Sequence, residues 1–209
     1  MTPVSQSGLD WAALRQAAAD CTRCDLYQHA TQTVFGEGPV PAVWMLVGEQ
    51  PGDDEDNTGR PFTGPSGELL DRALKVAGVD RDRLYVTNAV KHFKWTPRGK
   101  RRIHQTPNQT EIVACRPWLE DELRLATPAL VGLMGAVAAK SLLGTAFRVT
   151  QSRGQVLPVS IGGWSGSAVA TVHPSSILRA PDPTAREEGF DHFVADLRTM
   201  AAWVNQYQG

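Results

Sequence analysis

The chain has 209 residues, of which 42% are hydrophobic and 21% are charged, and its formal net charge is -1. Such a composition is typical of a globular protein with one sizeable core, and it excludes collagenous, disordered and coiled-coil proteins. We expect a single domain over residues 1–209, because this length leaves too little chain for two full domains.

The first residues and the longest apolar stretch both indicate a cytoplasmic protein. The start MTPVSQSGLDW lacks the basic and apolar segments of a secretory leader. The apolar stretch from Ala129 to Ala139 is far shorter than the roughly 20 residues that a membrane-spanning helix needs. We therefore expect no membrane association.

Predicted helices and strands alternate along the chain. Apolar residues at helical spacing predict a helix over Leu9 to Asp20, and the uninterrupted apolar run Val43 to Val47 predicts a strand buried on both faces. In the same way we predict strands at Leu84 to Val90, Ala129 to Met134 and Ala168 to Val172, and helices at Pro65 to Ala77, from Thr106 onward, at Ala136 to Leu143 and at Thr184 to Val204. This alternation indicates a three-layer α/β/α fold with a mainly parallel four-stranded central sheet.

Polar, turn-rich residues follow most of these predicted strands. Gly48 to Gly52 follow the first strand, Asn88 to His92 lie at the end of the second, and His173 to Ser176 follow the fourth. Because ligands of parallel sheets bind beyond the carboxyl ends of the strands, we expect these segments to converge on one functional edge.

Charge is segregated along the chain. Six Lys and Arg residues and no acid lie between Lys91 and His104, whereas Asp53 to Asp56 form an acidic run. Taken alone, a basic run is more often a solvated loop than a nucleic-acid contact.

Three cysteines and one histidine have the types and spacing of metal ligands. Cys21 and Cys24 form a C-x-x-C pair, Cys115 lies far along the chain, and His92 borders the basic run. A redox pair or two buried thiols are alternatives, although the redox motif opens a helix after a strand and this pair follows a predicted helix. By spacing alone, zinc with three cysteines and a histidine is as suitable as an iron-sulfur cluster.

Seven motifs in fixed order, spanning most of the chain, give the sequence a specific family resemblance. The motifs are Cys21-x-x-Cys24, Gly48-Glu49-Gln50-Pro51-Gly52, Pro61 to Gly67, Val86 to Phe93, Lys100-Arg101-Arg102-Ile103-His104, Ala114 to Trp118, and His173 to Arg179. With these motifs the chain resembles the iron-sulfur uracil-DNA glycosylases of DNA repair, and most closely the subgroup called UdgX, which shares a histidine at the position of His92 where related enzymes have a cysteine. The resemblance implies a uracil-DNA glycosylase-like fold and a 4Fe-4S cluster held by Cys21, Cys24, His92 and Cys115.

A glycosylase of this kind has to flip the base out of the DNA stack and read it in a closed pocket. Phe62 is the candidate for stacking on uracil, and the Asn88 amide is the candidate for accepting from uracil N3–H while donating to O4. Cytosine presents the reverse pattern, so one amide discriminates between the two bases. An ordinary core phenylalanine and a turn-stabilising asparagine are the alternatives.

Cleavage of the glycosidic bond leaves a cation-like sugar and a departing uracil anion. The resemblance implies that His173 donates to uracil O2 and that Gln50 positions the attacking water or contacts the base, and backbone amides from Gly48 onward can add donors. Glu49 is suited to stabilising the cation or accepting a proton. A strand-capping histidine and a surface glutamate are the alternatives for His173 and Glu49.

His104 distinguishes the UdgX subgroup. A neutral imidazole is a competent nucleophile, so His104 is expected to bond to the sugar carbon and leave the enzyme attached to DNA after one turnover. Without the resemblance, His104 is a phosphate-contacting loop residue. Phosphate contacts are also expected from the following residues: Lys100, Arg101, Arg102, Ser175, Ser176 and Arg179.

The expected partner is uracil-containing DNA, with single strands preferred, and the protein is expected to be a monomer. Two other functions remain open at this point: a glycosylase that turns over and releases abasic DNA, and a non-catalytic nucleic-acid-binding module stapled by a metal.

Overall fold

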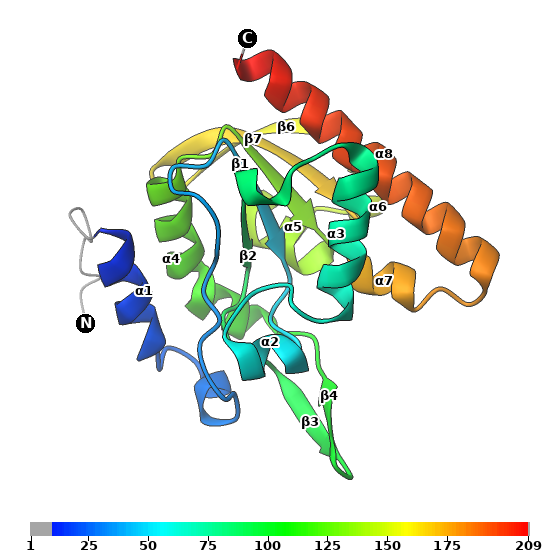
Figure 1. The fold of residues 1–209 in the computed structure, drawn as a ribbon. Helices are drawn as coiled ribbons and strands as arrows, with labels where there is room; N and C mark the ends of the chain where they lie inside the picture. The colour runs from blue at the N-terminus through cyan, green and yellow to red at the C-terminus, as the bar shows by residue number, and fades with distance from the viewer. Residues whose placement is uncertain (1–9, 209) are drawn as a thin grey trace.

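The computed structural model describes residues 10–208, so Leu9, at the start of the first predicted helix, lies outside the described residues. Five strands form the central sheet, in the order β2-β1-β5-β7-β6 (Figure 1). Four of them are parallel, namely β1 (Trp44–Gly48), β2 (Leu84–Asn88), β5 (Leu130–Met134) and β7 (Trp164–Thr171). These are the four predicted strands, and their parallel arrangement confirms the predicted fold class.

The predicted number of four strands is wrong, because β6 (Val156–Ile161) pairs antiparallel with β7 at the edge of the sheet. Most residues of β6 are exposed or half-buried, and the strand includes Pro158 and Ser160. An edge strand with one solvent-facing side lacks the continuous apolar run that identifies a strand buried on both faces.

Helices cover both faces of the sheet, and alternate residues of β1 show the layering. Met45 and Val47 pack in one core with α1 (Trp11–Ala19), α4 (Gln109–Ala126) and α5 (Ala136–Leu143). Trp44 and Leu46 pack in a second core with α3 (Pro65–Ala77) and α8 (Pro183–Gln208). Figure 1 shows α1 and α4 on one side of the sheet and α3 and α8 on the other.

The remaining elements are short and gather around the sheet. They are the helices α2 (Asp53–Thr58), α6 (Val149–Ser152) and α7 (Pro174–Leu178), and the 3-10 turns Asp25–Gln28 and Arg81–Arg83. Among residues 10–208, no helix combines the length and apolar character that crossing a membrane requires.

The basic segment folds as a hairpin that projects from the body of the protein. Strands β3 (Trp95–Arg98) and β4 (Arg101–His104) pair antiparallel, with Arg98 opposite Arg101. Gly99 occupies the intervening turn with a φ of 60°, a left-handed conformation that glycine adopts without strain. In Figure 1 the hairpin extends beyond α2, away from the central sheet.

Candidate active site

The carboxyl ends of the parallel strands converge as predicted. In the sheet register Gly48 lies opposite Asn88, the last residue of β2. A cavity of about 270 Å³ opens at this edge, and its lining includes Gln50, Phe62, Asn88, His104, His173, Ser175 and Arg179. Residues from five of the seven motifs therefore share one cavity.

Asn88 presents an unused hydrogen-bond acceptor at this cavity. Its side chain is buried, and Oδ1 has no hydrogen-bond partner within the described structure. A Cβ atom at Gly48 would lie 2.4 Å from Asn88 Oδ1 and 2.6 Å from Phe62 Cζ. Only glycine at position 48 allows the Asn88 amide and the Phe62 ring to come this close to the backbone of β1. A buried acceptor without a partner is costly, which favours a ligand donor at this position.

Phe62 is both a core residue and a wall of the cavity. It is buried among the apolar residues on the α3 side, and its φ of 58° is left-handed. A Cβ atom at Gly67 would lie 1.8 Å from the Phe62 carbonyl oxygen, so the two segments pack without space for a side chain. Such a conformation in a bulky residue is costly and is typical of functional sites.

His173 caps the helix α7 and also lines the cavity. The backbone N–H of Ser175 donates to His173 Nδ1 at 3.1 Å, which leaves the proton of a neutral imidazole on Nε2. Burial, followed by the charges of His104 and Arg179, lowers the pKa of His173 to about 4. At neutral pH His173 is therefore an uncharged hydrogen-bond donor.

Ser175 and Ser176 are engaged with His173. Ser175 Oγ lies 2.8 Å from His173 Nδ1, and Ser176 Oγ donates to the His173 carbonyl oxygen at 2.7 Å. Their position supports the orientation of His173, a role that the sequence did not predict.

Glu49 and His104 form a pair, of which His104 lines the cavity. His104 Nε2 lies 3.5 Å from Glu49 Oε1, and the imidazole is 47% exposed. Burial lowers the pKa of His104, and Arg179 lowers it further. Burial raises the pKa of Glu49, which Arg179 opposes. Arg179 thus lowers the pKa of Glu49, His104 and His173 alike. It favours a neutral imidazole beside an ionised carboxylate.

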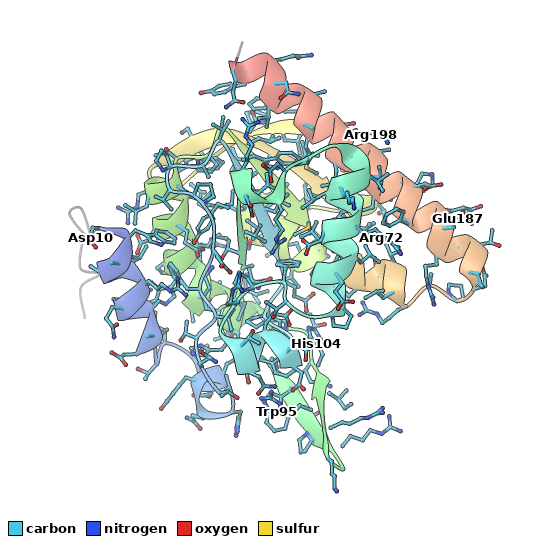
Figure 2. The ribbon with its side chains drawn as sticks, viewed as in Figure 1. Asp10, Arg72, Trp95, His104, Glu187 and Arg198 are labelled. Carbon is cyan, nitrogen blue, oxygen red and sulfur yellow. The ribbon has the colours of Figure 1, made fainter. Side chains whose placement is uncertain are left out.

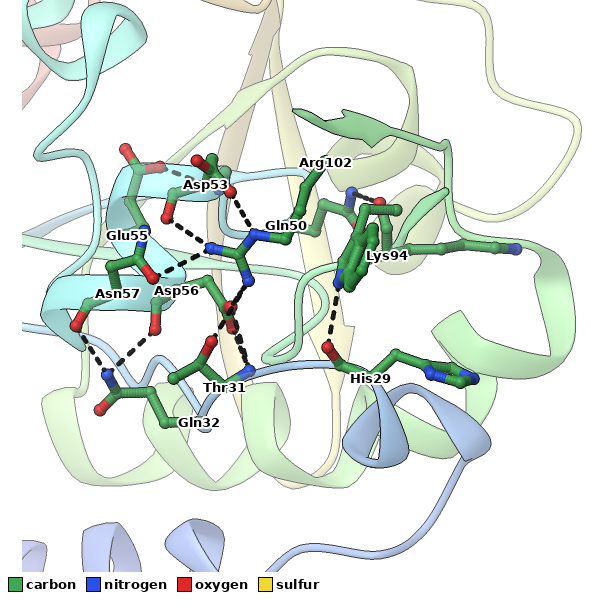
Figure 3. Close-up of polar contacts among 12 residues, drawn as sticks. His29, Thr31, Gln32, Gln50, Asp53, Glu55, Asp56, Asn57, Lys94 and Arg102 are labelled. Carbon is green, nitrogen blue, oxygen red and sulfur yellow. Dashed lines mark hydrogen bonds and ion pairs between the residues drawn. The ribbon is translucent and has the colours of Figure 1, made fainter. Parts of the chain in front are cut away.

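Gln50 holds the base of the hairpin. Its Nε2 donates to the carbonyl oxygens of Lys94 at 3.2 Å and Gln105 at 3.0 Å, and its Oε1 accepts from the Lys94 N–H at 3.1 Å. Lys94 and Gln105 are the residues that directly flank β3 and β4, and Figure 3 shows the Gln50 contact with Lys94. Both amide hydrogens are used by these bonds, so the side chain anchors the hairpin. Gln50 also lines the cavity, and its contact with water or base stays a prediction.

Arg102 joins the hairpin to the acidic run. Its guanidinium pairs with Asp53, lies 2.5 Å from Asp56 Oδ2, and donates to Asn57 Oδ1 at 3.0 Å (Figure 3). These acids begin α2, and sequence reasoning gave them no role. Because its donors are taken up by protein, Arg102 is a tether of the hairpin, and its predicted phosphate contact does not fit this arrangement.

The basic run therefore contributes fewer free charges than the sequence indicates. Lys91 is fully buried against Glu122, and Lys94 pairs with Glu111 at 2.9 Å. Arg98, Lys100 and Arg101 are exposed near the hairpin turn, and no ion pair involves them within residues 10–208. Within the basic run, the exposed charges without an ion-pair partner in the described structure lie at the tip of the hairpin.

The three cysteines are free thiols in one neighbourhood. Cys21 Sγ accepts from Trp118 Nε1 at 3.1 Å, and Cys115 Sγ accepts from the Lys91 N–H at 3.2 Å. Burial raises the pKa of Cys115 to about 12, against the charge and the N–H bond of Lys91, and the charges of Cys21 and Cys24 raise it further. Sulfurs that accept N–H bonds in a buried site fit thiolate ligands of a cluster.

His92 is less well placed as a ligand. It follows Lys91, which contacts Cys115, but its Nε2 lies 2.9 Å from Thr33 Oγ1. Over residues 10–208, no three His, Cys, Asp or Glu side chains are grouped closely enough to hold a single metal ion. The three thiols thus share one neighbourhood without forming a metal site by themselves, and the fourth predicted donor is bonded to Thr33.

Comparison with known proteins gives a consistent family match. Residues 35–198 match the uracil DNA glycosylase superfamily. The chain is 34% identical over 177 residues to a Type-4 uracil-DNA glycosylase of Pyrobaculum aerophilum, covering 83% of this chain and 87% of that protein. It is 35% identical over 162 residues to one of Thermotoga maritima, covering 76% and 78%, and 33% identical over 174 residues to one of Sulfurisphaera tokodaii, covering 81% and 76%.

Proposed function

The chain belongs to the uracil DNA glycosylase superfamily, and from this membership we propose that it excises uracil from DNA and then bonds covalently to the sugar through His104. The observation that carries the proposal is the cavity in which the unpaired Asn88 Oδ1 lies close to Phe62, with His104 and His173 on the same lining. A flipped base and a nucleophile can both reach this cavity.

Uracil recognition is assigned to the buried part of the cavity. Uracil N3–H supplies the donor that Asn88 Oδ1 lacks, and the base stacks on Phe62. Cytosine has an acceptor at N3 and would leave Asn88 Oδ1 unpaired. His173, neutral with its proton on Nε2, donates to uracil O2 as negative charge develops on the leaving base.

The covalent step is assigned to the Glu49–His104 pair. The glycosidic bond breaks with its electron pair on uracil, one imidazole nitrogen of His104 bonds to the sugar carbon C1′, and the imidazole proton passes to Glu49. An alkylated imidazole is a poor leaving group, so the enzyme stays attached to DNA. The covalent step is the one that the resemblance to the UdgX subgroup implies.

A 4Fe-4S cluster is assigned to Cys21, Cys24 and Cys115, with His92 as the fourth ligand in place of its bond to Thr33. When bound, the cluster would staple the N-terminal segment to α4 and to the end of β2, which is a structural task. Iron analysis of anaerobically prepared protein tests this assignment. Replacing His92 with Cys, which gives four thiolates, should retain iron if position 92 supplies a ligand.

DNA binding is assigned to the free cations near the hairpin turn, which are Arg98, Lys100 and Arg101, and to Arg179 beside the cavity. Single-stranded DNA is the preferred substrate in this proposal, because an unpaired base is extruded at the lowest cost. One copy of the chain suffices, since every assigned residue belongs to it.

The test is to mix the protein with uracil-containing and with matched cytosine-containing single-stranded DNA and analyse both by denaturing gel and by abasic-site cleavage. The proposal predicts a protein-DNA band that resists denaturation, with uracil DNA only. Cleavable abasic DNA without that band indicates a turnover glycosylase. Neither product indicates a binding protein without catalytic activity.

A further inference from the structure

Lys91 is a fully buried cation beside the base-reading residue. Its side chain is 0% exposed, and its Nζ donates to Glu122 Oε2 at 2.5 Å, to the Asn88 carbonyl oxygen at 2.6 Å and to Thr87 Oγ1 at 2.7 Å. An ammonium group has three N–H donors, so every donor of Lys91 is used.

The partner carboxylate of Glu122, on α4, is equally buried and fully engaged. Glu122 Oε1 accepts from the Tyr85 hydroxyl at 2.9 Å and from the Gly36 N–H at 3.0 Å, and Thr87 Oγ1 donates to the same carboxylate. The pair therefore fixes the end of β2 against α4 through several directional bonds.

Lys91 also connects the base-reading residue to the thiols through its backbone. Its N–H donates to Cys115 Sγ at 3.2 Å, while its side chain holds the carbonyl of Asn88. By contrast, the Asn88 carboxamide itself makes no hydrogen bond to another described residue. The orientation of Asn88 therefore depends on how its backbone is held and on the packing of Gly48.

Stability alone is a poor explanation for this arrangement. Burying two charges costs desolvation energy, and well-packed apolar side chains of similar volume are often as stabilising as a buried ion pair. Unlike apolar packing, the ion pair makes directional hydrogen bonds, which specify the atoms of β2 and α4 that lie opposite one another.

We propose that the Lys91–Glu122 pair is a positioning device for uracil recognition, which fixes the Asn88 backbone so that Oδ1 faces the flipped base. This inference rests on the proposed glycosylase function and assigns it two residues outside the cavity. Neither residue touches the substrate, and both act through Asn88.

The main variant is the double substitution Lys91→Met with Glu122→Gln, which removes both charges and leaves no lone buried ion. Its single-turnover excision of uracil should fall by about tenfold or more, because small misplacements of a reading group are costly. Thermal unfolding and iron content are measured on the same samples and should be unchanged. Tyr85→Phe, which removes one bond to Glu122 and none to Lys91, should excise uracil at the parental rate.

A double-mutant cycle with Asn88→Ala distinguishes positioning from general structural support. If the pair acts through Asn88, the double substitution should slow excision no further once Asn88 is Ala. An equal additional loss in the Asn88→Ala background would overturn the proposal, and so would a parental rate in the folded double variant.

Thr87→Val provides a second route should the double variant not fold. It removes the hydroxyl that bonds to both charges and leaves the charges paired. A smaller fall in the excision rate is expected, again absent in the Asn88→Ala background, and an unchanged rate would contradict the proposal. A parent chain that excises no uracil would instead refute the proposed function.

Discussion

The two parts of the site that meet at the cavity are built in different ways. Gly48, Phe62 and Asn88 belong to the buried core, where neighbouring atoms leave no space for change. His104 ends a projecting hairpin that is held mainly through individual side chains, among them Gln50 and Arg102 (Figure 3). Figure 2 shows His104 at the end of the hairpin nearest the body and Trp95 at the start of the opposite strand.

This difference indicates that base recognition and covalent capture are separable. Substitutions in the core part should abolish both base recognition and covalent capture, because capture requires that uracil is excised first. Damage to the hairpin should affect capture alone.

Gly48→Ala should abolish excision and adduct formation together, with a loss of at least about 100-fold. The added Cβ would lie within 2.6 Å of both the Asn88 amide and the Phe62 ring, so the pocket could not keep its shape. Single-turnover release of uracil measures the effect. Gly78 follows α3 in a left-handed conformation, and a Cβ atom built there would meet no other atom within 4 Å. Gly78→Ala is therefore a control for the cost of replacing a glycine. Parental excision by Gly48→Ala would contradict the packing account.

Asn88→Ala should slow uracil excision by roughly 5- to 150-fold, since losing an amide that reads a buried base edge costs on the order of 1 to 3 kcal/mol. Phe62→Ala should have an effect of the same kind through lost stacking. Both variants and the parent should leave cytosine intact, as measured on matched oligonucleotides. Full uracil activity in Asn88→Ala would show that another group reads the base.

Arg102→Gln should reduce the rate of adduct formation by about tenfold while uracil release persists. The substitution removes the charge that joins the hairpin to Asp53 and Asp56, and Arg102 itself does not line the cavity. The ratio of protein-DNA band to free abasic DNA measures the effect. Arg198→Gln, on the outer helix α8, removes the same charge far from the site and should leave the ratio unchanged. Equal losses of release and capture in Arg102→Gln would refute the division.

The smallest expected effect is a shift in pH dependence. Capture needs a neutral His104, and burial together with Arg179 lowers the pKa of His104 from its ordinary value of 6.5. The rate of adduct formation should therefore stay constant around neutral pH and decline only below pH 6.5. Arg179→Gln removes one of the two causes, so the decline should begin at higher pH. A profile of adduct rate against pH tests this, and a midpoint unmoved by Arg179→Gln would contradict it.

The sequence predicted the core part of the site well. Strands buried on both faces leave long apolar runs, and the residues after those runs must meet at one edge. This reasoning places Asn88 and His173 at that edge, and both line the cavity.

The hairpin part was predicted less well, because its contacts join residues far apart in the chain. Arg102 was counted as a phosphate contact, yet its partners lie 49 and 46 positions away. Lys91 was counted in the basic run but pairs with Glu122, 31 positions away. No local pattern reveals which charges will pair, and β3 and β4 carry too few apolar residues to show a strand period.

The most direct test of the division between recognition and capture is His104→Ser, compared with the parent on uracil-containing single-stranded DNA. Departure of uracil dominates an oxocarbenium-like step, so the variant should still release uracil while water completes the reaction at C1′. The account predicts a protein-DNA band on a denaturing gel for the parent, and cleavable abasic DNA without that band for the variant. A persistent band in His104→Ser, or loss of uracil release together with the band, would contradict it.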